Sequence, residues 1–270
     1  MYEEKILTFS FFSSYIIFSN IYNHFSNICI YLFNIYIYLL LLLLFYIDTH
    51  IGGDEVTNAC WQNAKQLTAI KSWMAANNIT DFSGVERYFN LFTQKSAYET
   101  KKRPIVWEDC FVNGNMMDTN VIVHVWRNTE RLVRAVKAGH DVIQSYGFYT
   151  DREDPLCSGT CSGVNWMFSW TFHDFYAMDL VKGLGLTAEE EKHVLGGEAA
   201  QWSESTDTVN VDAMALSRTV AIAERLWSPA TYTDPRLFEP RSQRFRCLAV
   251  RRGFSRAGPL SSDYCELADY

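Results

Sequence analysis

The sequence predicts an α/β protein in which strands and helices alternate from Asp48 onward. Three observations carry this prediction: short apolar segments, amphipathic segments between them, and Gly or Pro residues at the boundaries. One strand is expected to end before Asp54, and four more are expected at 104–107, 121–125, 141–144 and 194–199. Helices are expected at 57–77, 85–100, 131–137, 213–227 and 236–252.

Individual residues justify these boundaries. The helix at 85–100 is predicted from apolar residues at helical spacing, namely Val85, Tyr88, Phe89 and Phe92. Pro104 opens the next strand, and Gly139 ends the basic helix at 131–137. The order is therefore a series of βα units, as in sheets of parallel strands.

The first 47 residues have a different composition, so we divide the chain into residues 1–47 and residues 48–270. After Lys5 the first segment contains no Asp, Glu, Lys or Arg, and residues 28–47 are long enough to cross a bilayer as a helix. Two interpretations stay open: a transmembrane anchor, or low-complexity sequence from an incomplete or misjoined gene model, which we favour slightly.

Composition and motifs exclude several classes of function. The net charge of −7 and the pI near 5.4 leave no basic surface for nucleic acid. No Cys, His and carboxylate residues have the spacing of a metal site, and no glycine-rich phosphate loop precedes a helix. We expect a protein without a metal or other cofactor.

The candidate site is centred on the segment 50–56, His-Ile-Gly-Gly-Asp-Glu-Val. Neighbouring side chains in a strand point to opposite faces, so Asp54 and Glu55 can serve one cavity only where the chain leaves the strand. Gly52 and Gly53 permit that exit, because glycine reaches backbone angles closed to other residues. The alternative interpretation is that residues 52–55 form a polar turn in which Asp54 and Glu55 are solvated.

Three tryptophans strengthen the functional interpretation. Trp107, Trp126 and Trp202 each lie at or just past the end of a predicted strand. Large flat side chains there can stack on the apolar faces of a sugar ring and exclude water. His124, beside Trp126, is interpreted as a structural residue.

These segments, with Glu108-Asp109, 196–199 and Glu204, resemble the β-N-acetylhexosaminidases of glycoside hydrolase family 20 from about His50 to Cys265. The resemblance implies a (β/α)8 TIM barrel in which the strand before Asp54 is the fourth. The chain then supplies about strands 4 to 8, five of the eight. The barrel's first three strands and a smaller α/β domain are not recognisable.

The resemblance implies hydrolysis of terminal non-reducing N-acetylglucosamine or N-acetylgalactosamine by a retaining, substrate-assisted mechanism. Glu55 would be the general acid and base, and Asp54 would hold the substrate's acetamido N–H. The other matched positions bind substrate: Trp107, Trp126, Trp202 and Tyr149 around the acetamido group, Asp151 and Glu204 at the sugar hydroxyls, and, as weaker candidates, Arg152 and His50.

The cysteines indicate an oxidising compartment. The resemblance implies a disulfide between Cys247 and Cys265 and leaves Cys60 without its partner, while the pairing of Cys29, Cys110, Cys157 and Cys161 stays open. Asn78 begins the N-glycosylation sequon Asn78-Ile79-Thr80. We expect a lysosomal or extracellular protein, or a membrane protein if residues 28–47 form a helix.

Five strands leave unpaired edges, and the resemblance places an arginine that grips the substrate before the first strand seen here. We therefore expect this chain by itself to fold poorly and to hydrolyse little or nothing. The alternative function is a membrane-anchored, non-catalytic glycan-binding fragment. The expected partners are glycans that end in N-acetylhexosamine, and the protein is a candidate homodimer.

Overall fold

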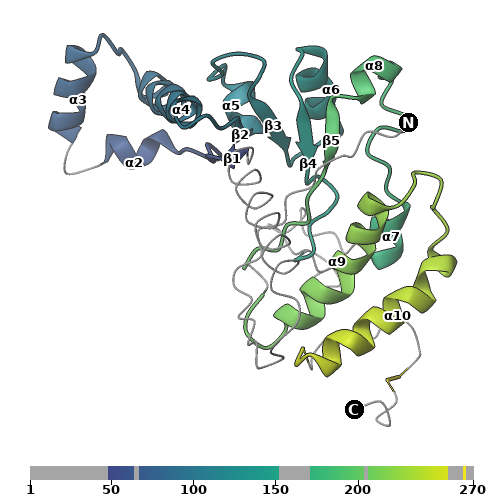
Figure 1. The fold of residues 1–270 in the computed structure, drawn as a ribbon. Helices are drawn as coiled ribbons and strands as arrows, with labels where there is room; N and C mark the ends of the chain where they lie inside the picture. Colours follow the sequence, from purple (N-terminus) through teal and green to yellow (C-terminus); the bar gives the residue numbers. More distant parts are fainter. Residues whose placement is uncertain (1–47, 64–66, 152–170, 204–205, 255–263, 266–270) are drawn as a thin grey trace, which may run out of the picture. The chain divides into compact units, whose positions relative to one another are not determined.

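The computed structural model describes residues 48–63, 67–151, 171–203, 206–254 and 264–265 (Figure 1). The chain divides into two compact units, the first from Met1–His124 with Ala138–Asp141 and the second from Val125–Lys137 with Val142–Tyr270. The strands follow chain order in the sheet, β1-β2-β3-β4-β5. The proposed domain boundary after residue 47 stays a prediction, because the described residues begin at residue 48.

The first unit is built on parallel strands. Its elements are β1 (Thr49–His50), α2 (Asn58–Gln62), α3 (Leu67–Ala76), α4 (Phe82–Glu99), β2 (Pro104–Trp107), α5 (Glu108–Val112) and most of β3 (Ile122–Val125). Thr49 pairs with Pro104, and Ile105 pairs with Ile122. Val106, Cys110 and Val121 form a buried cluster, because side chains of β2 and α5 face each other there.

The second unit is held together by its helices. Its elements are α6 (Thr129–Lys137), β4 (Val142–Gln144), α7 (Phe172–Ala177), α8 (Ala188–Glu191), β5 (Val194–Gly197), α9 (Val211–Trp227) and α10 (Pro235–Arg251). Strands β4 and β5 pair in parallel. Helices α7, α9 and α10 pack together (Figure 1), with Tyr176 stacked on Phe238 at 4.7 Å between ring centroids.

The predicted strands are confirmed, but the predicted helix at 57–77 is wrong. Two helices, α2 and α3, occupy that range, and α2 ends at Asn63. The Asn63 side chain donates from Nδ2 to the carbonyl oxygen of Ala59 at 3.0 Å. Asparagine competes in this way for backbone groups at helix ends. The short helices α5, α7 and α8 were not predicted.

Helix α4 forms where helical spacing predicts it, but its aromatic residues do not face the core. Tyr88, Phe89 and Phe92 are exposed, at 47%, 60% and 57%. The buried face is largely polar, with Glu86, Asn90, Gln94 and Ala97. Hydrogen bonds compensate the burial of Glu86 and Gln94: Glu86 Oε1 accepts from Nδ2 of Asn113 and of Asn115, and Gln94 Nε2 donates to the Asn115 carbonyl oxygen.

The N-terminal apolar segment, including the candidate anchor at 28–47, lies outside the described residues. Among the helices of the described part, none has both the length and the apolar character needed to cross a membrane.

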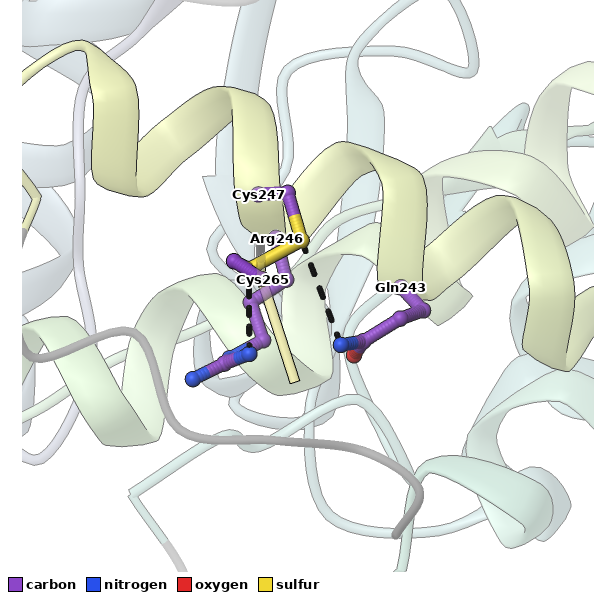
Figure 2. Close-up of a disulfide and its surroundings, with 4 residues drawn as sticks. All are labelled: Gln243, Arg246, Cys247 and Cys265. Atoms are coloured by element: carbon purple, nitrogen blue, oxygen red, sulfur yellow. Dashed lines mark hydrogen bonds between the residues drawn. A yellow bond between two sulfur atoms is a disulfide. The ribbon is translucent and has the colours of Figure 1, made fainter. Parts of the chain in front are cut away.

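A disulfide ties helix α10 to the C-terminal tail, as the resemblance implied. Figure 2 shows the bond between Cys247 and Cys265, whose Cα atoms are 5.4 Å apart. Gln243 Nε2 lies 3.9 Å from the Cys247 sulfur, and Arg246 Nη1 lies 3.2 Å from the Cys265 sulfur (Figure 2). Cys60 is free and exposed, as expected, and Cys110 is free and buried.

Loss of this disulfide is expected to lower the free energy of unfolding by about 3 kcal/mol, because the bond closes a loop between residues 18 apart in sequence. The measurement is a urea titration of wild type and of a Cys247→Ala/Cys265→Ala variant. Cys60→Ala is the matched control, since it removes a thiol without opening a loop. Equal midpoints for all three proteins would contradict the prediction.

Candidate active site

The segment that carries Asp54 and Glu55 leaves strand β1 as a tight turn. Gly52 and Gly53 have φ of +76° and +101°, and Glu55 has φ of +48°. Such angles are open to glycine and uncommon for other residues, so the turn needs its glycines. Asp54 and Glu55 both lie off the strand and are exposed, which agrees with both the shared site and the solvated polar turn.

Backbone hydrogen bonds attach this turn to strand β2. The Ile51 N–H donates to the Ile105 carbonyl at 2.9 Å, and the Trp107 N–H donates to the Gly52 carbonyl at 3.1 Å. The turn therefore lies beside Trp107, at the carboxyl end of β2. In this unit the structure brings together the predicted catalytic pair and one predicted substrate-binding tryptophan.

Position 53 also requires glycine because there is no space for a side chain there. A Cβ atom at this position would overlap the sulfur of Cys110, which is 1% exposed. The Cys110 sulfur lies 3.7 Å from the Gly53 carbonyl oxygen. Burial first, and then the charges of Glu86, Asp109 and Asp54, raise the pKa of the Cys110 thiol to about 12. Cys110 is thus a protonated packing residue under the turn.

Two histidines surround the Trp107 ring. His124 stacks on Trp107 at 4.1 Å between centroids with an interplanar angle of 24°, and His50 lies at 4.8 Å. The Nδ1 of His124 lies 3.3 Å from the Nε2 of His50, and the Gly52 N–H donates to Nδ1 of His50 at 3.1 Å. His50 thus has a backbone partner, and the residue as a whole is exposed although part of its ring is covered by the cluster.

His124 is fully buried, and sequence reasoning missed its place in this cluster. Burial, and secondarily the neighbouring His50, lower the pKa of His124 to about 3. Desolvation likewise lowers the pKa of His50, while the charge of Asp54 opposes that effect. Strand spacing could have supplied a signal, because His124 pairs in register with Trp107 on the adjacent strand.

In the second unit, Trp126 follows strand β3 and is half-buried. The guanidinium carbon of Arg127 lies 4.2 Å from the centroid of the Trp126 ring. This distance is within the range of a cation–π contact, which the sequence analysis did not predict. The contact covers one face of the indole ring.

Tyr149 and Asp151 follow strand β4 and lie beside the segment after β5. Tyr149 pairs with Ala200 in a parallel bridge, and the Thr150 N–H donates to the Ala200 carbonyl at 2.8 Å. Tyr149 is 8% and Asp151 is 2% exposed. Asp151 is therefore not a solvated surface charge.

Trp202 lies two residues beyond Ala200 and is 46% exposed. The structure thus brings the Tyr149–Asp151 segment next to the segment that carries Trp202, as expected if both contribute to one site. Arg152, Glu204, Cys157 and Cys161 lie outside the described residues. Within the described ranges, no three His, Cys, Asp or Glu side chains are grouped so that they could hold a metal ion.

The candidate residues share one structural position. They follow the carboxyl ends of β1, β2, β3, β4 and β5, and each pair β1–β2, β2–β3 and β4–β5 is parallel. Catalytic residues of (β/α)8 barrels occupy this position, because the loops after the strands form the active site. In this chain those positions carry acidic and aromatic residues.

Residues 20–230 match the catalytic domain of glycosyl hydrolase family 20, and the chain belongs to this family. It is 39% identical over 225 residues to a β-hexosaminidase subunit β of Entamoeba histolytica, covering 82% of this chain and 39% of that protein. It is 36% identical over 223 residues to a β-hexosaminidase subunit A2 of Dictyostelium discoideum, again covering 82% and 39%.

A solved structure supports the same fold. The chitobiase of Flavobacterium johnsoniae superposes with a TM-score of 0.59 and 27% identity, over 77% of this chain and 30% of that one. The prediction of an α/β partial (β/α)8 barrel is confirmed. The chain spans about two fifths of the length of the curated relatives that it matches.

Proposed function

We propose that this chain carries active-site residues of a β-N-acetylhexosaminidase, which removes terminal non-reducing N-acetylglucosamine or N-acetylgalactosamine from glycans with retention of configuration. Family membership supports the proposal, and the matched relatives are named β-hexosaminidases. The observation that carries it is the turn after β1, which places Asp54 and Glu55 beside Trp107 at the carboxyl ends of two parallel strands.

The nucleophile in this mechanism is the substrate's own 2-acetamido oxygen, which attacks C1 while Glu55 donates a proton to the leaving oxygen. The C1–O bond to the leaving group breaks, and an oxazolinium intermediate forms. Asp54 accepts a hydrogen bond from the acetamido N–H and stabilises the positive charge that develops there. Glu55, now a carboxylate, then takes a proton from the water that attacks C1, while the C1–O bond of the oxazolinium ring breaks and the 2-acetamido group is restored.

The remaining residues bind the sugar in this proposal. Trp107, Trp126 and Trp202 supply aromatic surface, and the Tyr149 hydroxyl contacts the acetamido oxygen. Asp151 accepts from sugar hydroxyls, an assignment that rests on the family resemblance. Glu204 has the same role, and Arg152 engages anionic groups on charged glycans; both assignments rest on the family resemblance.

We also propose that the protein works in a lysosomal or extracellular compartment. The disulfide between Cys247 and Cys265 supports an oxidising environment. The sequon residue Asn78 is exposed just after helix α3, where a glycan could be attached. Membrane association through residues 28–47 and homodimer formation are further proposals that rest on the sequence alone.

The experiment that tests the function is hydrolysis of 4-methylumbelliferyl N-acetyl-β-D-glucosaminide by the purified chain. Glu55→Gln is expected to lower kcat about 10²- to 10⁴-fold, because it removes the proton donor and leaves the shape of the side chain. Glu99→Gln is the matched control, since Glu99 forms a surface ion pair with Lys95 on helix α4. The assay uses a high protein concentration, because we expect this chain by itself to hydrolyse the substrate slowly.

Hydrolysis that is equal in wild type and Glu55→Gln would contradict this assignment of the catalytic acid. Binding of N-acetylglucosamine without hydrolysis, measured by calorimetry on the same samples, would instead favour the non-catalytic glycan-binding fragment.

A further inference from the structure

We propose that His124 is a positioning residue that acts through His50 on the turn carrying Asp54 and Glu55. The inference rests on the proposed function in one respect only, that Glu55 at the end of this turn is the catalytic acid. The hydrogen bonds themselves are independent of that function. All the residues involved lie in the first unit.

Four contacts link the two backbone polar groups of Gly52 to His50, His124 and Trp107. The Gly52 N–H donates to Nδ1 of His50 at 3.1 Å, and Nε2 of His50 lies 3.3 Å from Nδ1 of His124. The His124 ring stacks on Trp107 at 4.1 Å. The backbone N–H of Trp107 donates to the Gly52 carbonyl oxygen at 3.1 Å. Both polar groups of the Gly52 backbone are therefore linked to the same cluster of rings.

The Gly52 N–H determines the proton positions on both histidines. Nδ1 of His50 accepts from this N–H, so it carries no proton, and a neutral His50 must have its proton on Nε2. His50 Nε2–H then donates to His124, so Nδ1 of His124 is the acceptor and Nε2 of His124 carries the proton. Hydrogen bonds therefore run in one direction, from Gly52 to His50 to His124.

Packing holds the His124 ring in this arrangement, because the ring stacks on Trp107. Its ring is fully buried, and the only ring nitrogen that faces His50 is Nδ1. Without this acceptor the His50 ring would keep the hydrogen bond from the Gly52 N–H and lose the one at Nε2. His50 must also stay neutral, because a proton on Nδ1 would remove the acceptor for the Gly52 N–H. His124 thus determines the orientation of His50, and His50 determines that of the turn.

The turn needs such support. Gly52 and Gly53 have φ of +76° and +101°, and glycine is the most flexible residue in the backbone. Glu55 must reach the leaving oxygen within hydrogen-bond distance to transfer a proton. An error of about 1 Å in such a position can lower the rate about 100-fold.

Two variants of His124 separate positioning from packing. His124→Asn places an amide oxygen where Nδ1 lies and keeps the acceptor. His124→Phe keeps a flat ring against Trp107 and removes the acceptor. The tautomer of His50 is read by two-dimensional NMR of chain labelled with ¹⁵N-histidine, with His50→Gln to identify its signal among the six histidines.

In wild type and His124→Asn we expect a single His50 tautomer with the proton on Nε2. In His124→Phe we expect a mixture of both tautomers and an exchange of the Gly52 amide proton at least about 10-fold faster. A single Nε2–H tautomer and slow Gly52 exchange in all three proteins would overturn the proposal. A wild-type His50 with its proton on Nδ1 would also overturn it.

The hydrolysis assay is a second, separate measurement. His124→Phe is expected to lower kcat by about 10- to 100-fold with little change in KM, and His124→Asn is expected to restore most of the loss. A change in KM alone would show that His124 acts on substrate binding and would overturn the positioning role. If wild type hydrolyses nothing, the proposed function fails, and the NMR result alone decides whether His124 controls His50.

Discussion

Lowering the pH from 6.5 to 4 is expected to reduce the free energy of unfolding by about 3 kcal/mol through His124 alone. Burial lowers the pKa of His124 from 6.5 to about 3, with His50 as the smaller cause. Above pH 6.5 the imidazole is neutral in both the folded and the unfolded chain. Between the two values the unfolded chain binds a proton that the folded chain excludes, so stability falls by about 1.4 kcal/mol per pH unit.

The measurement is a series of urea titrations at pH values from 7.5 down to 4, followed by circular dichroism and compared with His124→Phe. Carboxylates also titrate at the acidic end of this range, but they contribute to both proteins and cancel in the difference. The wild-type curve is expected to be steeper by about one proton. Parallel curves for the two proteins would mean that His124 has the same pKa in the folded and the unfolded chain, and the stacked, buried arrangement would be wrong.

Gly53→Ala is expected to lower the free energy of unfolding by about 2–5 kcal/mol and to displace the turn that carries Glu55. The backbone at φ of +101° is strained for alanine, which accounts for about 1–2 kcal/mol. The added methyl group would also overlap the buried Cys110 sulfur, and such overpacking costs about 1–3 kcal/mol. Urea titration measures the total effect.

Two controls separate these causes. Gly52→Ala has a similar backbone angle of +76° and no atom within 4 Å of its Cβ, so it should show the backbone effect alone. Adding Cys110→Ala to Gly53→Ala removes the overlapping sulfur and should recover most of the packing effect. If Gly52→Ala and Gly53→Ala lower the free energy of unfolding equally, the Cys110 sulfur moves aside at no measurable cost and the packing effect is absent.

Local signals made the strands and the candidate turn predictable. Pro104 and Trp107 bound strand β2 in the structure as they do in the sequence prediction. The chain leaves β1 before Gly52, because only glycine tolerates the backbone angles there. The placement of Trp107, Trp126 and Trp202 at or after the ends of β2, β3 and β5 was also predictable, because strand ends can be recognised in sequence.

Long-range contacts were not predictable in the same way. Helical spacing identified α4, yet the buried face of α4 is polar, because its partners Asn113 and Asn115 supply hydrogen bonds from a segment that no periodicity reveals. The end of helix α2 was not predicted either. There the Asn63 side chain donates to the backbone carbonyl of Ala59.

The sequence by itself determined the family, the parallel α/β order and the carboxylate pair on a glycine turn, since each depends on residues near one another along the chain. Only the tertiary structure decided that His124 stacks on Trp107 and bonds to His50, which lies 74 residues away. It also decided that Asp151 is buried. The physical reason is that burial and hydrogen-bond partners depend on which segments pack together, and periodicity within one segment carries no information about its neighbours.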